Sequence, residues 1–138
     1  MKNKANLLLC AASLLALAST LSAQTPDADA LVARGRYLVE NVAGCADCHS
    51  TRDQRGQIVP ELHLKGAALP FAPTVPMPVW AAAAPMIAGL PGYTDEQAAH
   101  LLATGQKPDG SMPRPPMPQF RFADEDARAV VAYLRSLK

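Results

Sequence analysis

The chain is poor in the residues that usually build the core of a small protein. It has only seven aromatic residues and three cysteines among 138 residues. Cys10 lies in an apolar N-terminal segment, so the rest of the chain keeps only Cys45 and Cys48. Two cysteines this close together cannot form the disulfide framework that stabilises many small domains. We therefore expect another large apolar body to supply part of the core.

The chain also lacks an excess of charge of either sign. Thirteen basic residues oppose 12 acidic residues. The first 23 residues contain two of the lysines and no acidic residue, so 11 basic and 12 acidic residues remain in the rest of the chain. A nearly neutral chain lacks the basic surface that binds nucleic-acid phosphates, and we expect no nucleic-acid partner.

The N-terminus has the layout of a cleaved secretory signal. Two lysines among the first four residues precede an apolar run at residues 7–18, and Ala23 then leads into polar residues. A basic start, a short apolar segment and a small residue at the cut are the three parts of such a signal. We predict cleavage after Ala23, with Ala18 as the alternative site. Removal of residues 1–23 would leave one domain at residues 24–138, exported to the periplasm and not an integral membrane protein.

The most informative stretch is C-A-D-C-H at residues 45–49. Cys-x-x-Cys-His is the attachment sequence of a covalently bound c-type haem. Cys45 and Cys48 are placed to form thioether bonds to the haem vinyl groups, and His49 is placed to bind the iron. The second ring nitrogen of His49 should donate to a backbone carbonyl, and we expect a proline between residues 60 and 78 as the acceptor. The motif therefore predicts one haem c per chain.

Three other interpretations of the two cysteines are weaker. A structural zinc site needs four ligands, and the remaining His63 and His100 have no paired spacing. A thioredoxin-like pair needs alternating strands and helices, which the sequence does not show. A plain disulfide would close a very short loop, add little stability and leave His49 unexplained.

Three segments have helical patterns. Residues 27–42 begin with acidic residues and repeat apolar residues at helical spacing. Thr94-Asp95-Glu96-Gln97 is a capping box that starts a second, short helix, and Gly105 is its expected end. Residues 124–138 begin with three acidic residues, end with basic ones and have one apolar face.

The prolines define the rest of the fold. Twelve of the 13 lie between Pro60 and Pro118. Proline fixes φ and removes a backbone donor, so long irregular loops should surround the short middle helix. A haem would give these loops a surface to wrap. The predicted fold is all-α, with three or more helices and long Pro-rich loops around one haem.

The sixth ligand of the iron is less defined by the sequence. Met117 lies in Pro-Pro-Met-Pro at residues 115–118, and a stiff loop favours a defined bond from sulfur to iron. We predict Met117 as this ligand, with Met112 as the second choice. The other possibilities are an open site, Met77, Met86, His63 and His100.

Together these features resemble class I cytochromes c, the small monohaem electron carriers of the bacterial periplasm. The resemblance spans nearly the whole mature chain. It includes Gly35-Arg36-Tyr37-Leu38 in the first helix, Met117-Pro118 before the last helix, and Ala-Tyr-Leu-Arg-Ser-Leu at residues 132–137. In that family the first and last helices cross with a glycine against an aromatic residue, which implies that Gly35 packs against Tyr133.

Within the family, the chain is similar to cytochrome domains that serve membrane-bound dehydrogenases. The similarity rests on Gly35-Arg36-Tyr37-Leu38, on Gly105 with Asp109-Gly110, and on Pro116-Met117-Pro118. It implies redox partner proteins, with a dehydrogenase as the donor and a respiratory oxidase or another cytochrome as the acceptor. It also implies that Trp80 donates to a haem propionate and that Arg52 or Arg55 neutralises one.

These features favour a one-electron shuttle or cytochrome subunit that cycles between Fe(III) and Fe(II), and not an enzyme. The subunit could be associated with a membrane-bound complex. The alternative function is a haem-based catalytic or ligand-sensing domain. That alternative needs a displaceable sixth ligand and a distal acid–base residue, and only Arg114 and Arg121 lie near Met117 in the sequence.

Overall fold

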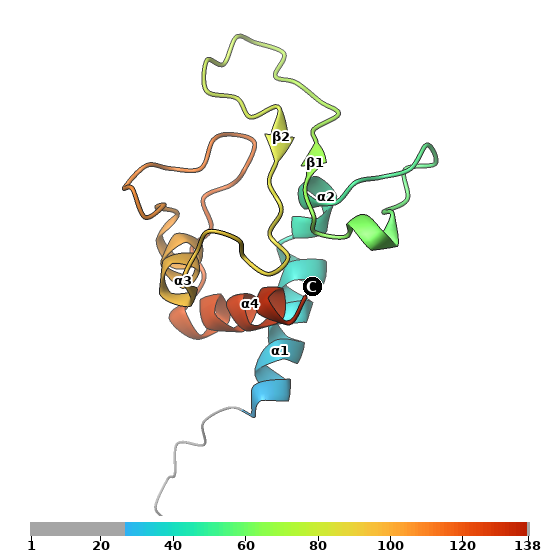
Figure 1. Cartoon of the computed structure of the whole chain (residues 1–138). Helices are drawn as coiled ribbons and strands as arrows, with labels where there is room; N and C mark the ends of the chain where they lie inside the picture. The colour runs from blue at the N-terminus through green and yellow to red at the C-terminus, as the bar shows by residue number, and fades with distance from the viewer. Residues whose placement is uncertain (1–26, 138) are drawn as a thin grey trace, which may run out of the picture.

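The computed structural model describes residues 27–137, so the predicted signal at residues 1–23 lies outside the described residues. The structure is mostly helical, which confirms the predicted fold class (Figure 1). No helix within residues 27–137 is long and apolar enough to cross a membrane. The elements in chain order are α1 (Ala28–Tyr37), η1 (Leu38–Val42), α2 (Cys45–His49), η2 (Pro60–Leu62), β1 (Ala67–Ala68), β2 (Ala83–Ala84), α3 (Asp95–Thr104) and α4 (Asp124–Ser136).

The first and last helices cross in direct contact. A Cβ atom on Gly35 of α1 would lie 1.9 Å from the carbonyl oxygen of Ala129 and 2.8 Å from the Cβ of Tyr133. Beside this contact, the guanidinium of Arg34 donates two hydrogen bonds of 2.9 and 3.1 Å to the Asp126 carboxylate. The structure therefore contains the predicted pair of Gly35 and Tyr133, and only a residue without a side chain fits at this point of α1.

The ends of the helices are set by local sequence. The helix that starts as α1 continues into η1 as a π-helical turn, in which the Ala43 N–H donates to Leu38 O at 2.8 Å. In α3 the predicted capping box is present, because Thr94 and Gln97 each accept a hydrogen bond from the backbone N–H of the other. The helix ends at Gly105, which has a φ of 73° and adopts the left-handed conformation that glycine favours.

The structure also contains a short sheet that the sequence did not predict. β1 and β2 pair antiparallel, with Ala67 opposite Ala84 and Ala68 opposite Ala83. Four alanines show no alternation of apolar and polar residues, so they give no strand signal. This ladder closes the base of a segment that projects away from the helices (Figure 1). We call residues 69–82 the apolar loop.

We predict that Gly35→Ala destabilises the protein by about 2 kcal/mol, because overpacking of about 3 kcal/mol outweighs a gain of about 1 kcal/mol in helix propensity. Urea unfolding followed by circular dichroism measures this free energy. The control is Gly56→Ala, whose Cβ would meet nothing within 4 Å but whose φ is +77°. Its cost should be about 1 kcal/mol. If Gly35→Ala were as stable as the wild type, the close contact between α1 and α4 would be contradicted.

Candidate functional site

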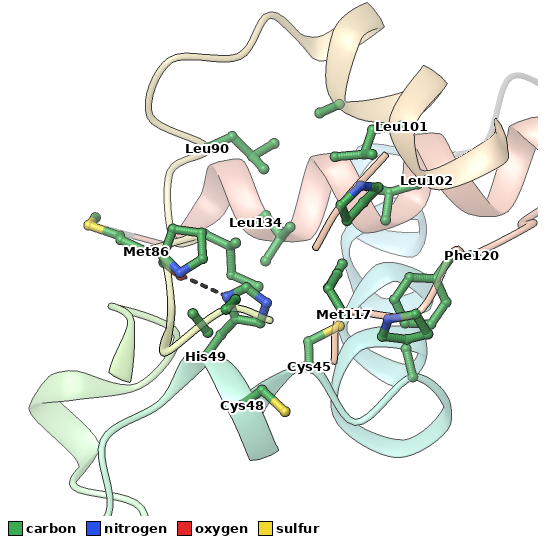
Figure 2. A pocket seen from close by; sticks show the side chains of 18 of the residues that line it. Cys45, Cys48, His49, Met86, Leu90, Leu101, Leu102, Met117, Phe120 and Leu134 are labelled. Atoms are coloured by element: carbon green, nitrogen blue, oxygen red, sulfur yellow. Dashed lines mark hydrogen bonds between the residues drawn. The ribbon is translucent and has the colours of Figure 1, made fainter. Parts of the chain in front are cut away.

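A cavity of about 430 Å³ lies among α2, α3, α4 and the loops before α3 and α4. Cofactor and ligand sites typically have volumes of about 300–1,000 Å³. Cys45, Cys48 and His49 all line this cavity, so the structure brings the whole predicted motif to one wall (Figure 2). The facing side chains are mostly apolar and include Leu90, Leu101, Leu102, Phe120, Val130 and Leu134.

His49 enters the cavity from the end of α2 and is only 6% exposed. Its Nδ1 lies 2.7 Å from the carbonyl oxygen of Pro85. A carbonyl can only accept, so Nδ1 donates, and in the neutral ring Nε2 keeps the lone pair that binds a metal. Burial lowers the pKa of His49, although the hydrogen bond to Pro85 opposes this shift. The acceptor is a proline, as expected, but the predicted range of residues 60–78 was wrong.

The acceptor loop is held in place by Leu64. The Leu64 carbonyl accepts hydrogen bonds of 2.9 and 3.0 Å from the backbone N–H groups of residues 87–88, just after Pro85. The Leu64 N–H donates to Ser50 Oγ at 2.9 Å, next to His49. Leu64 is fully buried and has a φ of 56°, a conformation that is costly for a residue with a side chain. Leu64 therefore links Ser50, next to His49, to residues 87–88, next to Pro85, in addition to the direct hydrogen bond between His49 and Pro85.

The cysteine environment suits an uncharged sulfur. Cys45 and Cys48 are not joined by a disulfide. Burial raises the pKa of the Cys45 thiol to about 11, and the nearby charge of Glu40 adds to the effect. Zinc sites and thioredoxin-like pairs use thiolates, whereas a thioether has no charge to bury. In the described residues, no group of three or more His, Cys, Asp or Glu side chains is arranged to hold a metal ion.

Two of the candidate sixth ligands line the cavity, Met117 and Met86. Met117 enters from the loop before α4, across from His49 in Figure 2. Met86 is 41% exposed, and its sulfur points away from the cavity (Figure 2). Met112 does not line the cavity and is 39% exposed. Of the two methionines that the sequence favoured, Met117 therefore lines the cavity and Met112 does not.

The other candidates lie elsewhere. Met77 is exposed in the apolar loop, and His100 is exposed on α3. His63 contacts Glu40, with 3.1 Å between His63 Nε2 and Glu40 Oε1. The hydroxyl of Tyr133 donates to the same Glu40 oxygen at 2.8 Å. Glu40, His63 and Tyr133 thus link η1, the residue after η2 and α4.

Trp80 has a buried donor without an acceptor. Its Nε1 is buried and makes no hydrogen bond within the described part of the chain. The ring packs edge-on against Phe71, with 6.1 Å between the ring centroids. The next residue, Ala81, lines the cavity. Buried polar groups are nearly always hydrogen-bonded, so an unpaired donor at this place fits a bound group that carries an acceptor.

The basic side chains next to the cavity are Lys107 and Arg114. The family resemblance implied that Arg52 or Arg55 neutralises a haem propionate, but neither side chain lines the cavity. Arg52 instead donates to the Asp47 carboxylate at 2.7 Å. The sequence placed Arg114 near Met117, whereas it gave no signal for Lys107, which only the folding of the loop before α4 brings to the cavity.

An apolar cavity with two cysteines and a buried histidine on its wall, and an unpaired buried donor next to Ala81 of that wall, fits a haem-binding protein. The cytochrome c family model matches residues 32–138, which is more than half of the chain. The chain therefore belongs to the cytochrome c family and is a class I c-type cytochrome with a covalently bound c-type haem and a haem-based electron-transfer role. No curated protein matches the chain.

We predict that Tyr133→Phe changes the pH dependence of stability. Burial, followed by the hydrogen bond and charge of Glu40, raises the pKa of Tyr133 to about 12, against about 10 in an unfolded chain. The folded state therefore holds this proton more tightly, and the wild type loses the corresponding stability as pH rises from about 10 to about 12. The variant should lack this loss. It should also be about 1–2 kcal/mol less stable at neutral pH, since it lacks a hydrogen bond to a carboxylate.

Urea unfolding at several pH values tests this prediction. Tyr37→Phe is the matched control, because Tyr37 is 52% exposed and the change should leave the pH profile as in the wild type. If Tyr133→Phe kept the full alkaline loss of stability, the hydroxyl of Tyr133 would not be its source.

Proposed function

We propose that this chain is a periplasmic one-electron carrier whose haem is attached through Cys45 and Cys48, with His49 and Met117 as the axial ligands of the iron. The observation that supports this proposal best is that His49 and Met117 enter one apolar cavity from different elements (Figure 2). A cavity with a ligand on each side suits an iron with both axial positions filled. Such an iron has no position for a substrate, which favours electron transfer over catalysis.

The protein groups have distinct tasks in this mechanism. The bound haem supplies the Fe(III)/Fe(II) couple. The Pro85 carbonyl holds the His49 ring in one orientation and fixes its tautomer. The thioether of Met117 favours the ferrous state and so raises the reduction potential. The apolar residues of the cavity exclude water, which lowers the local dielectric and further disfavours the more highly charged ferric state.

We also propose that the haem propionates lie near Trp80, Lys107 and Arg114. Trp80 Nε1 is a buried donor that lacks an acceptor in the described chain, and Lys107 and Arg114 are the basic residues of the cavity wall. A propionate would accept a hydrogen bond from Trp80 and be neutralised by one of the two cations. This assignment keeps the predicted role of Trp80 and replaces Arg52 and Arg55.

The proposed location and partners follow from the sequence. The basic and apolar N-terminus, with cleavage after Ala23, supports export to the periplasm. The resemblance to cytochrome domains of membrane-bound dehydrogenases supports such a dehydrogenase as the donor, and a respiratory oxidase or another cytochrome as the acceptor. In this arrangement the chain is a free shuttle or a subunit associated with the membrane-bound complex.

We predict that Met117→Ala lowers the reduction potential by on the order of 0.1 V or more, because axial ligands shift haem potentials over about 0.8 V. The variant should also lose the weak near-infrared absorption of a bond from sulfur to ferric iron. Potentiometric titration and absorption spectroscopy of the purified haem protein measure both. Met112→Ala is the matched control and should change neither. The opposite pattern would assign the ligand to Met112.

We predict that the wild type exchanges electrons rapidly and turns over peroxide poorly, because Met117 closes the iron. Stopped-flow reduction by a cell extract of the source organism, alongside a peroxide assay, compares the two activities. Met117→Ala opens the iron and should raise peroxide turnover above that of the wild type. Substantial peroxide turnover by the wild type, together with slow electron exchange, would instead favour the catalytic alternative.

A further inference from the structure

The apolar loop exposes more large apolar side chains than any other loop among residues 27–137. Residues 66–94 contain no charged side chain at all. In the apolar loop, Phe71 is 46% exposed, Val75 62%, Met77 39% and Val79 59%. Several large apolar side chains exposed on one uncharged loop are typical of an interaction site.

Contacts within the protein restrain the apolar loop. Four of its residues are prolines, which restrict the backbone. Its two arms are joined at the base by the β1–β2 ladder and by a hydrogen bond of 2.9 Å from the Leu69 N–H to Ala82 O. Further out, the rings of Phe71 and Trp80 pack edge to face. A loop restrained in this way loses less conformational entropy on binding than a free segment would, which favours its use as a docking element.

The apolar loop is also continuous with the haem site. Leu69 and Ala81, at the base of its two arms, line the cavity. The Ala81 N–H donates to Pro115 O at 2.8 Å, two residues before Met117. The loop rises from this base and projects away from the helices (Figure 1). A molecule seated on the loop would therefore lie beside the cofactor and next to the segment that carries the proposed sixth ligand.

We propose that the apolar loop, through Phe71, Val75, Met77 and Val79, is the docking site for a redox partner protein that presents an uncharged, apolar surface. The proposal rests on the electron-transfer function proposed above. The partner has no charge to pair with on this loop, so the contact is made by apolar burial and depends only weakly on salt. A bilayer is a poorer occupant, because an irregular loop would carry unpaired backbone groups into the hydrocarbon.

The test uses the purified haem protein and the double variant Val75→Glu/Val79→Glu. A cell extract of the source organism, membranes included, reduces and reoxidises each protein in a stopped-flow instrument, and ascorbate serves as a small reductant that needs no docking. We expect reduction or reoxidation by the extract to slow by roughly tenfold in the variant, as for loss of two central contacts. The ascorbate rate should stay at the wild-type value.

The control is Tyr37→Glu/Leu62→Glu, which adds the same two charges at residues that are 52% and 40% exposed and do not line the cavity. It should react with the extract like the wild type. If the extract reduced and reoxidised Val75→Glu/Val79→Glu as fast as the wild type, the proposed docking site would be wrong, while the proposed electron-transfer function would stand. If the extract exchanged no electrons with the wild type while ascorbate reduced it, the proposed function would fail, and the docking site with it.

Two further measurements test the two other possible occupants of the apolar loop, a lipid surface and a second copy of this chain. Flotation of the wild type with vesicles of phosphatidylethanolamine and phosphatidylglycerol, lost in Val75→Glu/Val79→Glu, would assign the apolar loop to a lipid surface instead. A dimer of the wild type in sedimentation velocity, with a monomeric variant, would assign it to a second copy of this chain. We expect the wild type to stay with the buffer in the first measurement and to sediment as a monomer in the second.

Discussion

The contact between Gly35 and the backbone of α4 determines where the rest of the structure lies. The helix that begins as α1 continues through η1 to Cys45, so the angle at the crossing fixes where the motif and His49 emerge. The loop that ends in α4 carries Met117, so the same crossing also fixes the other side of the cavity. The two proposed axial ligands are far apart in the sequence, but each is attached to one of the two crossing helices.

The loops between these helices have little regular structure, and hydrogen bonds to backbone carbonyls hold them instead. Leu64 O holds residues 87–88, beside the Pro85 acceptor of His49. At the end of α4, the Arg135 guanidinium donates to carbonyl oxygens within residues 89–93 and pairs with Asp95 at the start of α3. A single planar side chain with five donors thus joins α4, α3 and the loop over the cavity. These bonds give a proline-rich chain a defined shape without a large sheet.

Local sequence predicts those features whose cause is local. The haem motif, the capping box at Thr94 and the end of α3 at Gly105 depend on residues a few positions apart, and the sequence analysis identified all three. Pro85 as the histidine acceptor and Lys107 at the cavity wall depend on how distant loops fold against each other, and no spacing rule contains that information. The β1–β2 ladder was missed for another reason, because alanine favours neither face of a strand.

The scarcity of aromatic residues and disulfides has its explanation in the cavity. Among the buried core residues of the described chain, only Tyr133 is aromatic. Apolar surface left without contacts destabilises a core, so a bound group that fills this cavity adds apolar contacts that the side chains alone do not supply. The haem is therefore part of the hydrophobic core of this protein as well as its redox centre, and covalent attachment keeps that part of the core in place in both oxidation states.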